Sequence, residues 1–295
     1  MQTVKHWLDW THQQLKQSPL FYGHGSDNAW DEAVYLVMTA MDFPVMGEAH
    51  LLDESVSEQQ QKTIRQWVKR RIDNREPLPY ITGVAYFCGL PFVVDERVLI
   101  PRSPIAELIE QGFSPWIIDE PQQILDLCTG SACIAIACGY AFPEAELVAT
   151  DLSQQALEVA EINRLKHHQK NRLTLLQGNL FDALEGNQNH QQFDLIVTNP
   201  PYVDAEDMAN LPKEYMVEPA LALAAGDDGL NLVHTILRQA ADFLTTEGLL
   251  VVEVGNSAAA LEQSYPEVPF TWIEFAQGGD GVFVLNRSQL MKYFG

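Results

Sequence analysis

The stretch Ile124-Leu125-Asp126-Leu127-Cys128-Thr129-Gly130-Ser131 reads as a short apolar strand that ends in a turn at Gly130. The apolar segment 132–141 follows directly and predicts a helix. This order places backbone N–H groups in the crevice beyond the strand end, where open α/β sheets bind ligands. A glycine in the turn lets the main chain approach a ligand closely. The stretch therefore predicts an α/β fold with a ligand site at the carboxyl edge of its sheet.

Short apolar strands alternate with amphipathic helices from about Pro121 onwards, a pattern typical of a mostly parallel sheet with helices on both faces. We predict strands at 123–128, 146–150, 172–177, 193–198 and 248–254, and helices most clearly at 153–168 and 229–244. Residues 270–275 and 281–285 predict two final strands, and their short connection indicates an antiparallel pair.

The first 75 residues predict a small helical domain, because apolar residues recur there at helical spacing. Its last segment, 57–75, carries a group of basic residues around one apolar face: Lys62, Arg65, Lys69, Arg70, Arg71 and Arg75. Two interpretations of these residues remain open, a solvated helix face or a contact with RNA or an acidic partner. Prolines and glycines punctuate short aromatic and β-branched runs in 76–104, which predicts a β-hairpin linker.

The chain has 295 residues, of which 40 are acidic and 18 basic, giving a formal net charge of -22. Such a surface repels phosphate backbones, which argues against free nucleic acid as a partner. It would attract a basic protein, although acidity also simply keeps a protein soluble. No apolar run approaches the length of a membrane span and the N-terminus lacks a signal-peptide core, so we expect a cytoplasmic protein.

The four cysteines, Cys88, Cys128, Cys133 and Cys138, lack paired CxxC spacing. We expect them to be reduced and packed as small apolar groups, and we expect no metal site.

Asp151 stands twenty-one residues after Gly130, at the end of the strand predicted at 146–150. An acid at this spacing can accept hydrogen bonds from both ribose hydroxyls of a nucleotide. The loop lacks the G-x-G-x-x-G pattern, because Cys128 and Ala132 interrupt it, and this disfavours a dinucleotide with a pyrophosphate. S-Adenosyl-L-methionine has a ribose and no phosphate, and a terminal antiparallel strand pair is the variation seen in methyltransferases that use it. We therefore predict this cofactor, with Asn179 placed to hold its adenine.

The stretch Asn199-Pro200-Pro201-Tyr202 comes immediately after the strand predicted at 193–198. The double proline stiffens the turn and directs a carbonyl outward. The Asn199 side-chain oxygen can accept one N–H of a planar amide while the Pro200 carbonyl accepts the other. Two fixed acceptors would orient a poorly nucleophilic nitrogen for attack on a sulfonium methyl and stabilise the positive charge that it gains. This predicts methyl transfer to a planar amide or amino nitrogen, with Tyr202 stacked on the target.

Enzymes that methylate the exocyclic amine of a nucleic-acid base use a closely similar Asn-Pro-Pro-aromatic site. They need a basic channel and base flipping, and the net charge of -22 argues against that alternative.

Together these motifs resemble the family of glutamine methyltransferases that modify translation proteins, over nearly the whole chain. The stretch 98–104, which contains Pro101 and Arg102, is similar to the interdomain segment that lies over the substrate glutamine in that family. The resemblance implies a class I S-adenosylmethionine-dependent methyltransferase with a Rossmann-like, seven-stranded sheet and a small N-terminal helical domain. We expect a helical substrate-recognition domain at 1–75, a hairpin linker at 76–104 and a methyltransferase domain at 105–295.

The family has two branches, one acting on peptide release factors and one on the third protein of the large ribosomal subunit. The stretches 22–25, 100–108 and 126–131 are similar to the ribosomal-protein branch. The release-factor branch usually has Pro-Asp-Thr-Glu after the arginine and glycine where Cys128 stands. We therefore expect a basic ribosomal protein as the substrate. A non-enzymatic alternative is a ribosome-assembly factor that keeps the fold but has lost methyl transfer, and the presence of both Asp151 and Asn199 argues against it. The family commonly has glycine where Ala132 stands, and we expect the alanine to be tolerated.

The motifs and the resemblance imply the following site residues. The residues expected to bind the cofactor are Asp126, Cys128, Thr129, Gly130, Ser131, Ala132, Asp151, Leu152, Asn179, Leu180 and Asn199. The residues expected to bind the substrate are Pro101, Arg102, Asn199, Pro200, Pro201 and Tyr202, of which Asn199, Pro200 and Tyr202 are also expected to be catalytic.

Overall fold

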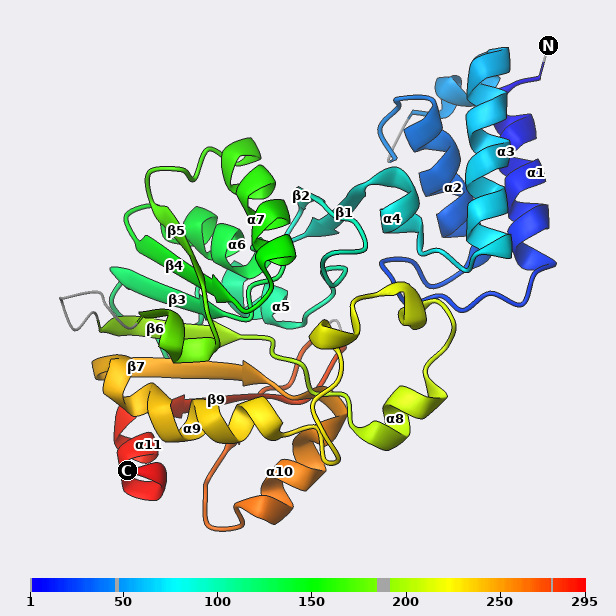
Figure 1. Ribbon diagram of the computed structural model, residues 1–295. Coiled ribbons are helices and arrows are strands. Elements are labelled where there is room, and N and C mark those ends of the chain that lie inside the picture. Colours follow the sequence, from blue (N-terminus) through cyan, green and yellow to red (C-terminus); the bar gives the residue numbers. More distant parts are fainter. Residues whose placement is uncertain (1, 46–47, 185–191, 277) are drawn as a thin grey trace. The chain divides into compact units, whose positions relative to one another are not determined.

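The computed structural model describes residues 2–45, 48–184, 192–276 and 278–295, and these residues divide into two compact units. The helical unit comprises Met1–Ala85, Val94–Glu96 and Pro212–Val217. The sheet unit comprises Tyr86–Val93, Arg97–Leu211 and Glu218–Gly295. Both are visible in Figure 1. Each unit has its own core and is described separately below.

Four helices build the helical unit: α1 (Val4–Lys16), α2 (Ala29–Ala40), α3 (Glu58–Asp73) and α4 (Leu78–Thr82), with a 3₁₀ turn η1 (Ala49–Asp53). The side chains of Thr3, Asn28 and Ser57 accept hydrogen bonds from the first-turn N–H groups of α1, α2 and α3. Trp7 of α1 and Ile64 of α3 are fully buried in the shared core. The predicted N-terminal helical domain is confirmed.

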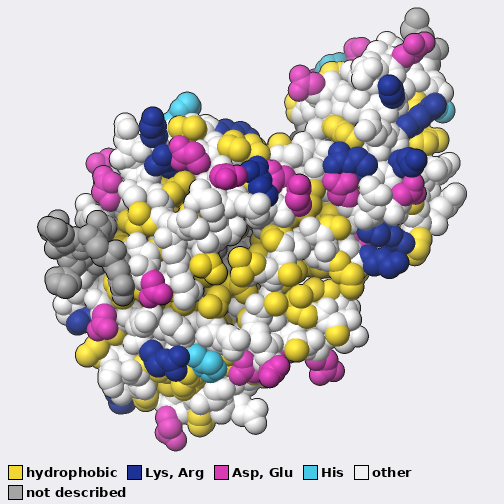
Figure 2. All heavy atoms as spheres, viewed as in Figure 1, with side chains coloured by type: hydrophobic (Ala, Val, Ile, Leu, Met, Phe, Trp, Pro, Cys, Tyr) yellow, Lys and Arg dark blue, Asp and Glu magenta, His cyan; other side chains and the backbone are white. Residues whose placement is uncertain are grey.

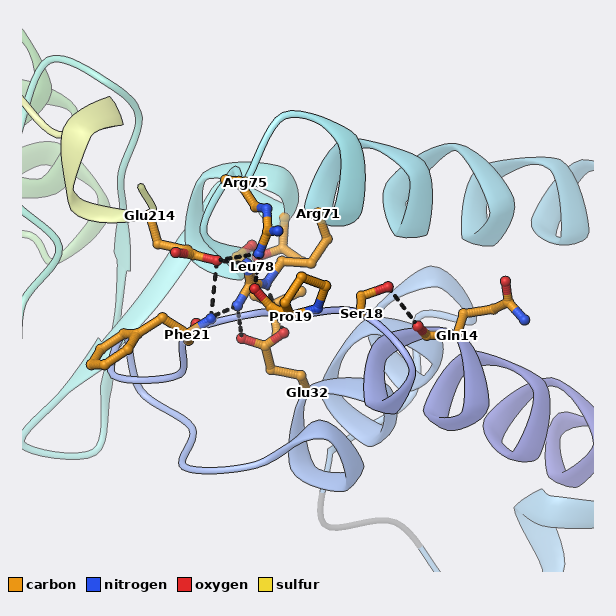
Figure 3. Close-up of polar contacts among 10 residues, drawn as sticks. Gln14, Ser18, Pro19, Phe21, Glu32, Arg71, Arg75, Leu78 and Glu214 are labelled. Atoms are coloured by element: carbon orange, nitrogen blue, oxygen red, sulfur yellow. Dashed lines mark hydrogen bonds and ion pairs between the residues drawn. The ribbon is translucent and has the colours of Figure 1, made fainter. Parts of the chain in front are cut away.

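A buried cluster of charges lies in the helical unit around Arg71 (Figure 3). Arg71 is 1% exposed and donates two hydrogen bonds to Glu32, at 2.8 and 3.1 Å, and one to Glu214 at 3.3 Å. Glu214 also accepts from Arg75 at 3.3 Å and from the Phe21 N–H at 3.0 Å. Two carboxylates therefore balance two guanidinium groups, which offsets much of the desolvation cost of burying them. The cluster fixes the segment 212–217 within this unit.

Most of the basic residues of 57–75 have partners inside the helical unit. Besides Arg71 and Arg75, Arg70 donates to Glu76 at 2.8 Å, and the Arg65 guanidinium lies 5.1 Å from the centroid of the Trp7 ring. Lys62 and Lys69 are exposed on α3. Three of the six basic residues thus form internal ion pairs, while Lys62, Arg65 and Lys69 are exposed, so both interpretations of this segment stay open.

Seven strands form one sheet in the order β5-β4-β3-β6-β7-β9-β8. Their bounds are β3 (Gln123–Leu127), β4 (Glu146–Asp151), β5 (Leu173–Gln177), β6 (Phe193–Thr198), β7 (Leu244–Glu253), β8 (Thr271–Trp272) and β9 (Val282–Asn286). The five neighbouring strands β5, β4, β3, β6 and β7 are parallel to one another, whereas β9 is antiparallel to both β7 and β8. The predicted class I methyltransferase fold, with its terminal antiparallel pair, is confirmed. The chain runs outward from β3 and returns at β6, so the crevice for a ligand lies between these two strands.

Helices cover both faces of this sheet (Figure 1). On one face lie α5 (Ile105–Glu110), α6 (Cys133–Ala141) and α7 (Gln154–Lys166), and on the other α9 (Asn231–Phe243), α10 (Ala258–Ser264) and α11 (Arg287–Phe294). Side chains alternate between the two cores, as in any strand: Ile124 packs on the α6 side, while Leu125 and Leu127 pack on the α9 side.

Three shorter elements and four 3₁₀ turns complete the described chain, the turns being η2 (Leu180–Leu184), η3 (Tyr215–Val217), η4 (Ala220–Ala222) and η5 (Gly255–Ser257). Strands β1 (Val84–Phe87) and β2 (Leu90–Val93) form the two-stranded sheet predicted for the linker, and α8 (Ala205–Asn210) follows β6. The four cysteines are free thiols. Among the described residues, no helix is long and apolar enough to cross a bilayer.

Candidate active site

The loop that follows β3 has an unusual backbone. Cys128, Gly130 and Ala132 all adopt the left-handed conformation, with φ of 57°, 54° and 63°. This conformation costs an L-residue with a Cβ atom about 1–2 kcal/mol. Two such residues in one short loop indicate a backbone shape that is retained for a functional reason.

Asp151, the last residue of β4, is bonded to this loop. Its Oδ2 accepts from the Gly130 N–H at 2.8 Å and its Oδ1 accepts from the Ser153 N–H at 2.8 Å. Burial raises the pKa of the Asp151 carboxyl, and the two backbone donors oppose that shift. Each oxygen retains a further lone pair, so the carboxylate can accept from a pair of neighbouring hydroxyls.

Asp126 lies inside β3 and is 1% exposed. Its Oδ2 accepts from the Thr129 hydroxyl at 2.6 Å and from the Ala135 N–H at 3.1 Å. Its Oδ1 and the Thr150 hydroxyl have no hydrogen-bond partner among the residues that the structure describes. Burial raises the pKa of Asp126 to about 7. Orphaned buried polar atoms are rare in native proteins, and beside a ligand-type loop they fit a polar, positively charged ligand.

A cavity of about 250 Å³ opens at the carboxyl ends of these strands. Many residues singled out from the sequence line it: Cys128, Gly130, Asp151, Leu152, Asn179, Leu180, Asn199 and Pro201. The rest of the wall comes from Thr150, Ser153, Ala156 and Gly178 and from residues in 97–99, 219–225 and 231–232. Leu152 and Leu221 are more than half exposed, and Figure 2 shows apolar side chains gathered around a hollow in this unit. Strand ends that are far apart in the sequence thus share one cavity.

The remaining predicted site residues do not line the cavity. Asp126, Thr129, Ser131 and Ala132 are buried and lie outside the lining. Pro101, Arg102, Pro200 and Tyr202 also lie outside the lining.

The Asn199–Tyr202 turn is held by backbone and side-chain bonds. The Tyr202 hydroxyl donates to Glu253 at 2.9 Å, and its carbonyl accepts from the Ser257 hydroxyl at 2.8 Å. Beyond the turn, the Val203 N–H donates to the Leu223 carbonyl at 2.8 Å. The turn is therefore connected directly to the 219–225 wall of the cavity.

Two buried glutamates hold the segment 98–104. Arg102 donates to both carboxylate oxygens of Glu218, at 2.8 and 3.1 Å, and the Ile100 N–H donates to the same group at 3.4 Å. The Ser103 hydroxyl donates to Glu253 at 2.5 Å. Arg102, expected to contact a substrate, is thus paired with a carboxylate of its own chain.

Sequence motifs did not identify Glu218, Glu253 or the wall formed by residues in 219–225 and 231–232. Glu253 could have been identified from the sequence, because this acid ends an apolar strand just as Asp151 does. Residues 219–225 carry no helical or strand period and gave no signal. Among the described residues, no group of three or more His, Cys, Asp or Glu side chains could hold a metal ion.

The chain is similar in sequence to known methyltransferases. Residues 116–226 match the family described as Methyltransferase small domain, and residues 6–83 match the PrmC N-terminal domain. The ribosomal protein uL3 glutamine methyltransferase of Francisella tularensis subsp. tularensis is 46% identical over 99% of this chain and 93% of that protein. The protein of the same name from Bordetella pertussis is 42% identical over 98% of this chain and 97% of its own length.

Proposed function

The chain belongs to the family of ribosomal protein uL3 glutamine methyltransferases, and from this premise we propose that it binds S-adenosyl-L-methionine in the cavity beside Asn199 and methylates a glutamine side chain of uL3 there. The observation that carries the proposal is the shared cavity: the loop after β3, the acid after β4 and the Asn-Pro-Pro-Tyr turn after β6 all meet at it.

The residues present fit this cofactor. Asp151 would hold the ribose, because its two oxygens are fixed by backbone donors and retain acceptor capacity. Asn179 and Leu180, both in the cavity wall, would hold the adenine. The Cys128–Ala132 loop would hold the methionine part, where the buried carboxylate of Asp126 favours a positively charged group. The cofactor supplies the activated methyl group on its sulfonium.

Asn199 and Pro200 would act on the glutamine amide. Its nitrogen is a weak nucleophile because its lone pair is delocalised into the carbonyl. The Asn199 side-chain oxygen and the Pro200 carbonyl would accept its two N–H groups, orient the lone pair, and stabilise the positive charge that develops. Held in this way, the nitrogen would face the activated methyl group, which it would take from the cofactor's sulfur. The nitrogen then loses a proton, which needs no dedicated base because methylation makes it acidic.

Charge favours the encounter with this substrate. A free ribosomal protein is strongly basic, whereas this chain has a formal net charge of -22. Opposite charges raise the association rate at low salt and lose this effect as salt screens them. We therefore expect kcat/KM for free uL3 to fall as ionic strength rises.

The test is intact-mass analysis of purified uL3 after incubation with the enzyme and S-adenosylmethionine, with a peptide release factor in a parallel reaction. One added methyl group on a uL3 glutamine, absent with Asn199→Ala, is expected. Methylation of the release factor alone would move the protein to the other branch of glutamine methyltransferases, and methylation of neither would refute the proposal.

A further inference from the structure

Glu253 lies at the edge of the sheet that carries the site, yet no step of the mechanism above uses it. It is the last residue of β7, and Val252 before it pairs with Thr198, the last residue of β6. Glu253 therefore stands level with Asn199, the first residue beyond β6. Its side chain is buried, with 4% of the residue exposed.

The carboxylate of Glu253 joins two separate parts of the site. One oxygen accepts from the Tyr202 hydroxyl at 2.9 Å and the other from the Ser103 hydroxyl at 2.5 Å. The Ser103 oxygen in turn accepts from the Ile105 N–H at 3.2 Å, at the start of α5. Hydrogen bonds from hydroxyls to a carboxylate are short and strong. A single buried group thus ties the Asn-Pro-Pro-Tyr turn to the segment 98–104.

Tyr202 is confined on its other sides as well. A Cβ atom on Gly255 would lie 2.5 Å from the Tyr202 ring, and one on Gly229 would lie 2.3 Å from its carbonyl oxygen. The Ser257 hydroxyl donates to that carbonyl. Close glycine backbone fixes where the tyrosine lies, and the bond to Glu253 fixes the direction of its hydroxyl.

We propose that Glu253 is the positioning residue of this site: its two hydrogen bonds, to Tyr202 and Ser103, hold the turn and the segment 98–104 in the arrangement that accepts the substrate glutamine. This inference rests on the proposed function. Misplacing a positioning group by about 1 Å can cost about 10²-fold in rate, so the effect belongs in kcat rather than in cofactor binding.

The experiment compares Glu253→Gln, Tyr202→Phe and the double variant. Glutamine offers one acceptor oxygen where glutamate offers two, so one hydroxyl loses its acceptor. We expect each single variant to lower kcat with uL3 by about tenfold, with KM and the Kd for S-adenosylmethionine changed by less than about threefold. The double variant should be slowed by clearly less than the roughly hundredfold product of the two single effects, because both changes act on the hydrogen bonds of one carboxylate.

A matched control lies on the same two strands. The Thr245 hydroxyl of β7 donates to Asp194 of β6 at 3.1 Å, at the opposite end of the sheet. Thr245→Val removes a bond of the same kind far from the site and should lower the melting temperature while leaving kcat unchanged.

The outcomes separate the two proposals. If wild-type enzyme methylates uL3 and Glu253→Gln keeps the kcat of Thr245→Val, the positioning role is wrong and the proposed function stands. If wild-type enzyme does not methylate uL3, both fail. Should Glu253→Gln not fold, Ser103→Ala and Tyr202→Phe each remove one of its bonds, and wild-type kcat in both would overturn the inference.

Discussion

Replacing Asp126 by asparagine should make the ligand-free protein less sensitive to rising pH. Burial raises the pKa of the Asp126 carboxyl to about 7 in the folded protein, against about 3.9 in an unfolded chain. The folded protein therefore binds this proton more tightly than the unfolded chain does, and stability is lost as pH rises from about 4 to about 7. Three pKa units correspond to about 4 kcal/mol in total.

The asparagine variant keeps the shape but cannot ionise. Its amide leaves a buried N–H group near the position of the orphaned Oδ1, which costs about 1–3 kcal/mol at every pH. The informative quantity is therefore the change with pH. Between about pH 5 and about pH 8, the wild-type protein should lose about 3 kcal/mol relative to Asp126→Asn.

Urea unfolding of the ligand-free proteins, followed by tryptophan fluorescence at both pH values, measures this difference. Glu253 and Asp151, whose pKa values burial also raises, are present in both proteins, and the Asp151 charge is one of the causes that raise the pKa of Asp126. A stability difference that stays the same at both pH values would refute the reasoning, because it would mean that Asp126 ionises normally.

The Asp126 carboxyl should also make the affinity for S-adenosylmethionine depend on pH. A positively charged ligand favours the ionised form of Asp126, so wild-type affinity for S-adenosylmethionine should fall by up to about tenfold per pH unit below pH 7. In Asp126→Asn the affinity should be weaker and nearly flat over this range. Isothermal titration calorimetry measures both.

Three further substitutions have defined outcomes. Arg71→Met leaves Glu32 buried without its partner and should destabilise the helical unit by about 3–5 kcal/mol in urea unfolding, with much of the loss recovered in Arg71→Met/Glu32→Leu. Ala132→Gly relieves about 1–2 kcal/mol of left-handed strain but loses about 0.8 kcal/mol of buried methyl contact, so the two effects largely offset each other. Stability and the Kd for the cofactor should therefore change little. A protein that binds the cofactor only after this substitution would contradict the expectation. Gly255→Ala, at a φ of 45° and with its Cβ 2.5 Å from the Tyr202 ring, should lower kcat; wild-type kcat would show that the turn tolerates movement.

Short sequence patterns made the first strands and the ligand loop of the sheet unit predictable. The strand predicted at 123–128 lies at Gln123–Leu127, and Asp151 ends β4, because each of these features is determined by neighbours in the sequence. Strand bounds were less accurate where polar residues interrupt the pattern. Strand β7 begins at Leu244 rather than at 248, because Thr245, Thr246 and Glu247 do not read as apolar, and β8 is only Thr271–Trp272.

The parts that could not be predicted depend on long-range contacts. Arg102 and Glu218 are 116 residues apart, and Ser103 and Glu253 are 150 residues apart. No window of sequence contains both partners, so the sequence shows neither the burial of Glu218 nor which residues bind either glutamate. Residues in 219–225 matter because they line the cavity, and side chains that line a cavity need not follow the periodic pattern of a helix or strand.

The basic residues of 57–75 show how the lack of information on long-range contacts alters a functional interpretation. Charge spacing in 57–75 indicates where cations are, but only the fold shows that Arg70, Arg71 and Arg75 are bound to carboxylates of the chain itself. Internal pairing lowers the net positive charge of this segment, although Lys62, Arg65 and Lys69 remain exposed on α3. The net charge of -22 disfavours a phosphate backbone and favours attraction of a basic protein.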